Sequence, residues 1–257
     1  MAFVAVGGHR LEYEWFGPRR ASAPIVMLHE GLGSLSLWKD FPHRLADATK
    51  RRVLAYSRYG YGASDPLTGP RGVDFMHIEA LQTLPELLDA LEVRTPVLFG
   101  HSDGASIALI HAARSHRSVS AVVALAPHVF VEPYGVQAIA DTRLAYLDVD
   151  GELRGKLARR HADVESAFWG WNDIWLSPEF VAWNIEALLP EIACPVLAIQ
   201  GKDDEYGTLA QIDRLALGVR RLRRLELPRC GHSPHRDQPD AVLAETCRFL
   251  GGLTGPP

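Results

Sequence analysis

The stretch "PVLFGHSDGASIAL", from Pro96 to Leu109, indicates a buried strand that turns sharply into a helix. Apolar residues lead into a serine that lies between two glycines, and small or apolar residues follow it. A tight strand-to-helix turn forces its central residue into a strained conformation and crowds the neighbouring positions. Gly100 and Gly104 satisfy that need for small neighbours, and the turn would present Ser102 at its tip.

In this setting the pattern G-x-S-x-G is typical of a nucleophile elbow. The turn would place the Ser102 hydroxyl at the carboxyl end of the sheet, where the N–H groups that open the next helix favour negative charge. The alternative is a serine that only caps the helix in a tight turn. We interpret Ser102 as a candidate catalytic nucleophile.

Strand-like and helix-like segments alternate along most of the chain. Two alternating runs around Gly7 and Gly8 predict a hairpin. Leucines three and four residues apart from Leu81 to Leu91 predict a helix, and "QPDAVLAETCRFL" predicts the last helix. The alternation predicts an α/β fold with a mostly parallel sheet flanked by helices. Short continuous apolar runs, which are typical of strands buried on both faces, occur at 24–29, 52–57, 96–100, 120–126 and 195–201.

One segment, residues 129–190, breaks this alternation. It shows no buried strand, and it is polar, helical in pattern and rich in aromatic residues. We predict that it is a helical cap inserted into the chain over one end of the sheet. The core of the fold would then comprise residues 1–128 and 191–257.

The aromatic residues of this insertion are candidates for a substrate pocket. Helical spacing puts Phe168, Trp171 and Trp175 on one face and turns Trp169 aside. We predict that at least one of these rings roofs the Ser102 pocket and favours apolar or aromatic groups. The alternative is that the rings only hold the insertion against the body of the protein.

A serine hydroxyl needs a general base, and histidine is the usual one because its pKa lies near 7. His232 lies in a loop between an apolar run, "LRRLEL", and the predicted last helix, so it would reach the carboxyl edge of the sheet. His235 is the alternative three residues later. A metal site built from Cys230, His232, His235 and Asp237 would match no common zinc spacing.

The base in turn needs a carboxylate that fixes its tautomer and stabilises the imidazolium. Asp203, Asp204 and Glu205 follow directly after the buried run at 195–201. A solvated acidic turn is the alternative interpretation. With Asp204 as the acid, the order serine, acid, histidine is the chain order of a known hydrolase arrangement.

On these motifs the chain resembles the α/β-hydrolase superfamily, and in particular its small, capped, bacterial esterase-like members. The resemblance covers nearly the whole chain. In that family the acid is usually the third residue after the strand's glycine, which implies Asp204 after Gly201, with Asp203 in reserve. The family's histidine follows a glycine before the last helix, which implies His232. The stretch "YSRYGYGASD" is similar to a further family loop, with Ser57 in place of an aspartate.

The resemblance also implies an oxyanion hole. The family loop H-G-x-G corresponds to His29-Glu30-Gly31-Leu32-Gly33, so the donors would be the backbone N–H groups of Gly31 and Asp103. Glu30 departs from the pattern, since glycine normally follows the histidine. Either Glu30 turns away and bonds to the body of the protein, or it is protonated or takes a substrate-specific part.

The function that follows is hydrolysis of a carboxylic ester of a small apolar or aromatic substrate through an acyl-enzyme. The resemblance leaves lactone, thioester and carbon–carbon bond hydrolysis open, with a non-catalytic ligand receptor as a further alternative. The mechanism requires neither a metal nor an organic cofactor, and the expected partner is a small-molecule ester.

Bulk properties narrow the class of protein further. The chain has 257 residues, of which 47% are hydrophobic and 23% charged, so a large core is expected. A net charge of −4 argues against general nucleic-acid binding. Three cysteines, no signal-peptide pattern and no long apolar run favour a cytoplasmic protein without a membrane segment. The sequence does not predict the oligomeric state.

Overall fold

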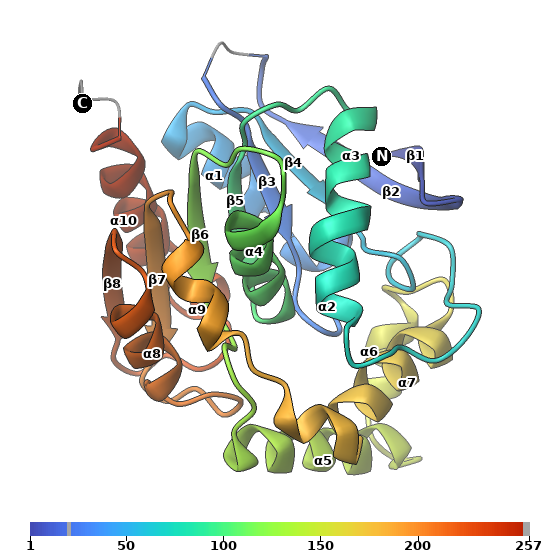
Figure 1. Cartoon of the computed structure of the whole chain (residues 1–257). Helices are drawn as coiled ribbons and strands as arrows, with labels where there is room; N and C mark the ends of the chain where they lie inside the picture. The colour runs from blue at the N-terminus through green and yellow to red at the C-terminus, as the bar shows by residue number, and fades with distance from the viewer. Residues whose placement is uncertain (20–21, 254–257) are drawn as a thin grey trace.

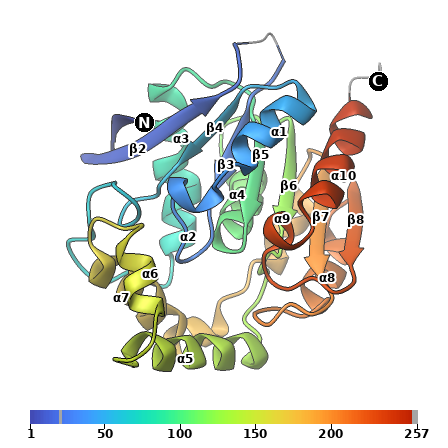
Figure 2. The ribbon, with the colours of Figure 1, turned by 180° about the vertical axis from the view of Figure 1, so that it is seen from behind.

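A single mixed sheet forms the centre of the molecule, as a computed structural model of residues 1–19 and 22–253 describes it (Figures 1 and 2). The strand order is β1-β2-β4-β3-β5-β6-β7-β8. The pairs β1–β2 and β2–β4 are antiparallel and the other pairs are parallel, so the predicted mostly parallel sheet is confirmed. The strands are β1 (Ala2–Val6), β2 (His9–Phe16), β3 (Ile25–Leu28), β4 (Val53–Tyr56), β5 (Val97–His101), β6 (Ala121–Leu125), β7 (Val196–Gly201) and β8 (Leu222–Leu227).

The central strands are apolar on both faces because helices cover both faces. Val26, Leu98 and Val122 pack into one hydrophobic cluster, whereas Met27 and Phe99 point to the opposite side and join a second cluster. The first cluster is covered by α3 (Leu84–Ala90) and α4 (Asp103–Arg114), which face the viewer in Figure 1. The second is covered by α1 (Phe41–Thr49) and α10 (Pro239–Gly251), which face the viewer in Figure 2.

The predicted hairpin, buried strands and last helix are confirmed at these positions. The predicted helix from Leu81 to Leu91 is part of a longer helical run. It starts with α2 (Phe75–Ile78), continues through one π-helical turn at Glu79–Thr83, and ends as α3.

Residues 129–190, which we name the cap segment, form most of the connection between β6 and β7. Figure 1 shows its helices below the sheet, on the side to which the arrowhead of β6 points. The segment pairs with itself in one isolated bridge, Phe130 with Asn184, and is otherwise helical or irregular. Its helices are α5 (Pro133–Leu147), α6 (Leu153–Ala158) and α7 (Val164–Trp175), followed by 3₁₀ turns at Pro178–Ala182 and Glu186–Glu191.

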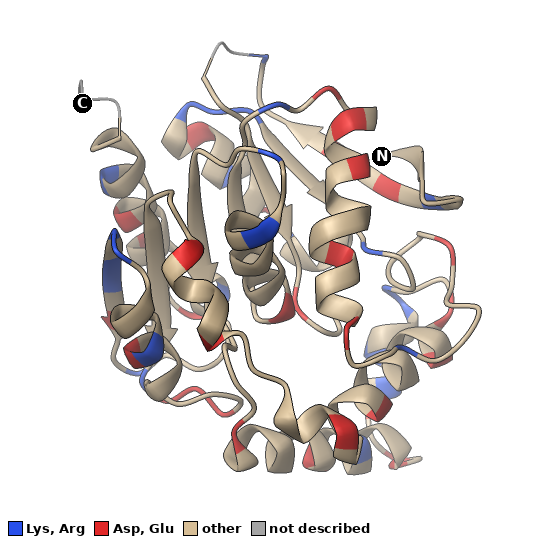
Figure 3. Cartoon of the chain, in the orientation of Figure 1, with Lys and Arg blue, Asp and Glu red and all other residues tan. Residues whose placement is uncertain are grey.

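Charged residues of both signs are interspersed over the helices and loops (Figure 3). In the described part of the chain, no helix combines the length and the apolar character that crossing a bilayer requires.

Candidate active site

Ser102 occupies a strained turn between β5 and α4. Its backbone angles are φ 53° and ψ −121°, in a region that residues with a side chain rarely adopt. The flanking glycines are required by close approach. A Cβ on Gly100 would lie 2.3 Å from the Gly104 carbonyl oxygen, and one on Gly104 would lie 2.1 Å from the oxygen of Leu28. The turn therefore packs directly against the end of β3 and holds the serine in place.

The structure brings Ser102, His232 and Asp204 into one hydrogen-bonded series. The Ser102 Oγ lies 2.9 Å from His232 Nε2, and His232 Nδ1 lies 2.9 Å from each carboxylate oxygen of Asp204. These side chains come from three loops, which follow β5, β7 and β8. Parallel strands end at the same edge of a sheet, so residues 130 positions apart in the chain meet there.

Of the two adjacent aspartates, Asp204 is the one that contacts the imidazole. Its side chain is buried and accepts further hydrogen bonds from the backbone N–H groups of Tyr206 and Gly207. Asp203 is exposed. His235 lies apart from Ser102 and is buried, with its ring 4.7 Å from that of Trp38.

The contact between His232 and Asp204 shifts their pKa values in opposite directions. Burial alone would lower the pKa of His232, but the Asp204 carboxylate outweighs it, so the pKa of His232 is raised. Burial would raise the pKa of Asp204, and His232 together with the hydrogen bond from the backbone of Tyr206 lowers it instead. Asp204 is therefore ionised, and His232 gains basicity from it.

The peptide bond between Glu30 and Gly31 is fixed through its carbonyl oxygen. That oxygen lies 2.7 Å from His29 Nδ1 and accepts hydrogen bonds from Arg58 Nη2 at 2.9 Å and from the N–H of Gly33 at 3.1 Å. His29 Nε2 accepts from the N–H of Arg58, so the hydrogen of the neutral ring lies on Nδ1. In a trans peptide the N–H points away from the carbonyl. The N–H of Gly31 is thus oriented away from these partners.

The Glu30 side chain bonds to the body of the protein. Its carboxylate lies 3.4 Å from His101 Nδ1 and accepts a hydrogen bond of 3.1 Å from Arg236 Nη2. Burial would raise its pKa, but His101 and Arg236 overcome burial and hold the pKa of Glu30 well below its usual value. Of the alternatives left by the sequence, the structure favours the ionised carboxylate held by its neighbours.

Ser102 lines a hollow of about 170 Å³. Gly31 and Asp103, the predicted oxyanion donors, line it together with Glu30. From the cap segment, Ile139, Trp171 and Trp175 contribute an apolar wall. Polar side chains also line the hollow, among which are His128, Glu205, Ser233 and Arg236.

Phe168, Trp171 and Trp175 of α7 share one buried face, as the spacing predicts. Trp171 and Trp175 line this hollow, and Phe168 does not. Phe168 is fully buried elsewhere, with its ring stacked 3.6 Å from that of Tyr146. The placement of Phe168 in the substrate pocket is therefore corrected. It lies seven residues before Trp175, which is roughly 10 Å along the helix axis at about 1.5 Å per residue.

The two pocket tryptophans also present polar atoms. Trp175 Nε1 donates a hydrogen bond of 3.2 Å to the carboxylate of Asp103, which lies 3.7 Å from Arg58 Nη2. Burial raises the pKa of Asp103, against the opposing effect of Arg58. The pyrrole edge of Trp171 covers Gly31 so closely that a Cβ there would lie 2.1 Å from its Nε1. The cap segment is thus held against both predicted oxyanion positions.

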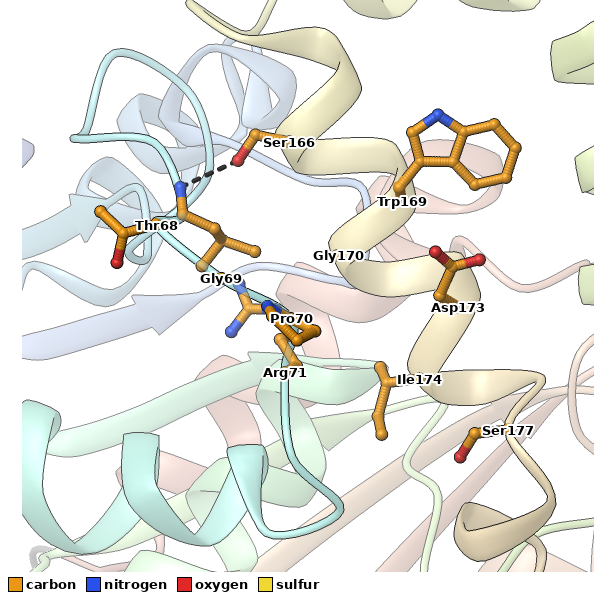
Figure 4. A pocket seen from close by; sticks show the side chains of 11 residues that line it. Thr68, Gly69, Pro70, Arg71, Ser166, Trp169, Gly170, Asp173, Ile174 and Ser177 are labelled. Atoms are coloured by element: carbon orange, nitrogen blue, oxygen red, sulfur yellow. Dashed lines mark hydrogen bonds between the residues drawn. The ribbon is translucent and has the colours of Figure 1, made fainter.

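A larger hollow of about 530 Å³ lies on the other side of α7 (Figure 4). It is bounded by residues 67–71 and by Trp169, Gly170 and Asp173 of α7. Two of its polar side chains are engaged locally, since Ser166 Oγ accepts from the N–H of Leu67 and Asp173 pairs with Arg143. The larger volume does not make it the candidate active site, because Ser102 and His232 line the smaller hollow.

One residue beside the nucleophile was not predicted from the sequence. His128 Nε2 lies 3.4 Å from Ser102 Oγ, and its side chain is buried. The signal was available, because His128 follows the predicted buried strand at 120–126 just as Ser102 and Asp204 follow theirs. In the described residues, no group of three or more histidine, cysteine or acidic side chains is arranged to hold a metal ion.

A mostly parallel sheet with a serine on a strained turn at its carboxyl edge defines a class of hydrolase folds. The family model described as "Alpha/beta hydrolase family" matches residues 25–245, and the chain therefore belongs to that family.

Individual relatives are distant but span most of the chain. The serine hydrolase BPHL of Mus musculus is 27% identical, over 91% of this chain and 80% of its own length. The proline iminopeptidase of Heyndrickxia coagulans is 21% identical over 98% of both chains. Among solved structures, the enol-lactonase from Burkholderia xenovorans LB400 superposes with a TM-score of 0.75 at 25% identity, covering 97% of this chain and all of that one. These relatives support the assignment of the chain as a hydrolase. Their names imply different cleaved bonds.

Proposed function

We propose that the protein is a serine hydrolase that cleaves a carboxylic ester of a small substrate through an acyl-enzyme. The observation that carries the proposal is the hydrogen-bonded series from Ser102 through His232 to Asp204. A serine hydroxyl becomes a competent nucleophile when such a base lies within hydrogen-bonding distance and is itself oriented by a third group.

In this mechanism Ser102 Oγ attacks the carbonyl carbon while His232 Nε2 takes the hydroxyl proton. Asp204 stabilises the resulting imidazolium, and the N–H groups of Gly31 and Asp103 stabilise the oxyanion. Losing one such donor typically costs about 10²–10³ in rate. His232 then gives its proton to the leaving group, and water releases the acyl group from Ser102 by the same sequence of steps.

The dimensions of the hollow favour a short acyl group with an apolar part. Its volume of about 170 Å³ is well below the roughly 300–1,000 Å³ of sites for drug-sized ligands. Ile139, Trp171 and Trp175 supply apolar surface on one side. A small acyl group against these rings would satisfy both the volume and the lining.

The bond that is cleaved is best tested with a panel of substrates. The panel contains p-nitrophenyl esters of increasing acyl length, simple lactones, thioesters, prolyl amides and vinylogous diketones. We expect the highest kcat/KM for short acyl esters. A fluorophosphonate probe should label the wild-type chain and leave Ser102→Ala unlabelled. An unlabelled wild-type protein, or a labelled Ser102→Ala, would contradict the proposed nucleophile.

A further inference from the structure

Two imidazoles contact the same hydroxyl group. His232 Nε2 lies 2.9 Å from Ser102 Oγ, and His128 Nε2 lies 3.4 Å from the same oxygen. The proposed mechanism uses only the first of them. The second contact is long, but catalytic hydrogen bonds are often long in the unliganded state and tighten when substrate binds.

Counting hydrogens assigns the direction of both contacts. His232 Nδ1 donates to Asp204, so Nε2 of the neutral ring is an acceptor and receives the only hydrogen of the Ser102 hydroxyl. No hydrogen of Ser102 remains for His128. The contact at 3.4 Å is therefore a hydrogen bond only if His128 carries its hydrogen on Nε2 and donates it to Ser102 Oγ.

The surroundings hold His128 in this position. Ser106 Oγ donates to the His128 carbonyl oxygen at 2.6 Å, and the next residue, Val129, donates its N–H to Gln211 at 2.7 Å. The His128 ring packs edge-on against Trp175, with centroids 5.0 Å apart. Burial lowers its pKa to about 3, so the ring stays neutral where His232 titrates. It is a fixed donor rather than a second base.

We propose that His128 is a further catalytic residue, whose Nε2–H stabilises Ser102 Oγ as the leaving group when the acyl-enzyme is hydrolysed. This inference rests on the proposed function. In that step a water oxygen bonds to the acyl carbon and gives its proton to His232. The bond between the acyl carbon and Oγ then breaks, its electron pair goes to Oγ, and His232 returns the proton there. His128 keeps its own proton throughout.

The effect is larger on deacylation than on acylation. In the free protein His128 already donates to the hydroxyl Oγ, so this hydrogen bond gains less strength as Oγ attacks the substrate than it gains as Oγ leaves the acyl group. In the acyl-enzyme Oγ is an ester oxygen and a weak acceptor, and it becomes a strong one as it leaves. Only an interaction that strengthens towards the transition state accelerates a step.

The test compares His128→Phe with His128→Gln in reactions with p-nitrophenyl acetate. Phenylalanine keeps a ring and removes the donor, whereas glutamine places an amide N–H near the position of Nε2. We expect His128→Phe to release p-nitrophenol in a burst and to lose its acetyl group about 10- to 100-fold more slowly than wild type, as for other hydrogen bonds to a charged group. We expect His128→Gln to recover much of the deacylation rate.

The matched control is His111→Phe. It removes another buried imidazole, from α4, at a site outside the hollow. Thermal unfolding of all variants shows whether stability changes, and intact-mass measurement follows the acetyl group directly. The ratio of deacylation to acylation should fall in His128→Phe and stay at the wild-type value in His111→Phe.

Two results would overturn the role of His128. The first is a folded His128→Phe that loses the acetyl group at the wild-type rate. The second is a His128→Gln that is as slow as His128→Phe, which would assign the residue to packing. With either result, labelling of the wild-type chain by the fluorophosphonate would still support the proposed function. A wild-type chain that reacts with neither probe removes both proposals.

Discussion

The carboxyl edge of the sheet and the cap segment border the same hollow, but they are built in different ways. At the sheet edge, Ser102 and Asp204 follow strands whose register is set by backbone hydrogen bonds to neighbouring strands. In the cap segment, Trp171 and Trp175 come from a single helix, α7, whose position depends on side-chain contacts such as that between Trp175 and Asp103. The edge therefore holds reacting groups in fixed geometry, while the cap shapes the space beside them.

This difference predicts two kinds of mutational effect. Changes at the sheet edge should reduce the rate for every substrate by a similar factor, because all substrates share the bond-breaking step. Changes in the cap segment should alter the ratio between substrates, because only the substituent beside the rings differs.

The largest effect is expected for Ser102→Ala. We expect kcat to fall by about 10⁴-fold or more for all substrates, as for the loss of the serine in other triads. The fold should survive, because alanine is small and the hydroxyl faces the hollow. Steady-state rates with acetate and longer esters, together with circular dichroism, check both points. Activity of Ser102→Ala near the wild-type level would show that Ser102 is not the nucleophile.

The two adjacent aspartates provide the next test. Asp204→Asn should lower kcat by about 10⁴-fold, because an amide stabilises neither the correct tautomer nor the imidazolium of His232. Asp203→Asn is the matched control, and its exposed side chain predicts an effect of only a few-fold. Both variants should act equally on short and long esters. If Asp203→Asn were the inactive variant, the acid would be wrongly assigned.

The pH dependence should report His232. The base must be neutral to accept a proton, and its pKa is raised by Asp204 above the ordinary value of 6.5. Below that raised pKa, kcat/KM should fall about tenfold per pH unit, and above it the profile should level off. In Asp204→Asn, NMR titration should find the pKa of His232 lowered. An unchanged pKa of His232 in Asp204→Asn would show that Asp204 does not raise the pKa of His232.

The smallest effect, and the most selective, is expected in the cap segment. Trp171→Ala should reduce kcat/KM about 10- to 200-fold more for the ester whose acyl group contacts the ring than for acetate, in line with the loss of one apolar contact. Trp169→Ala is the matched control, because Trp169 lines the hollow on the other side of α7. Equal losses for both esters in Trp171→Ala would mean that the ring only holds the cap segment in place.

Local sequence patterns predicted much of the fold and of the candidate site. The glycines around Ser102, the short apolar runs and the turn before the last helix are read within a few residues. Each depends on backbone geometry or on burial of one short element. The proximity of Ser102, Asp204 and His232 in space then follows from the rule that parallel strands end at one edge. For this reason the sheet, its mostly parallel character and the grouping of these three side chains were predictable from the sequence.

Tertiary structure decided the rest, since contacts between distant segments leave no local trace. Helical spacing correctly put Phe168 on the face of Trp171 and Trp175, but the stacking partner Tyr146 lies on another helix and draws Phe168 away from the hollow. The ionised state of Glu30 depends on His101 and on Arg236, which lies 206 residues later in the chain. The sequence by itself determined which residues follow the strands; only packing decided which of their side chains reach Ser102, because direction and distance are properties of the assembled elements.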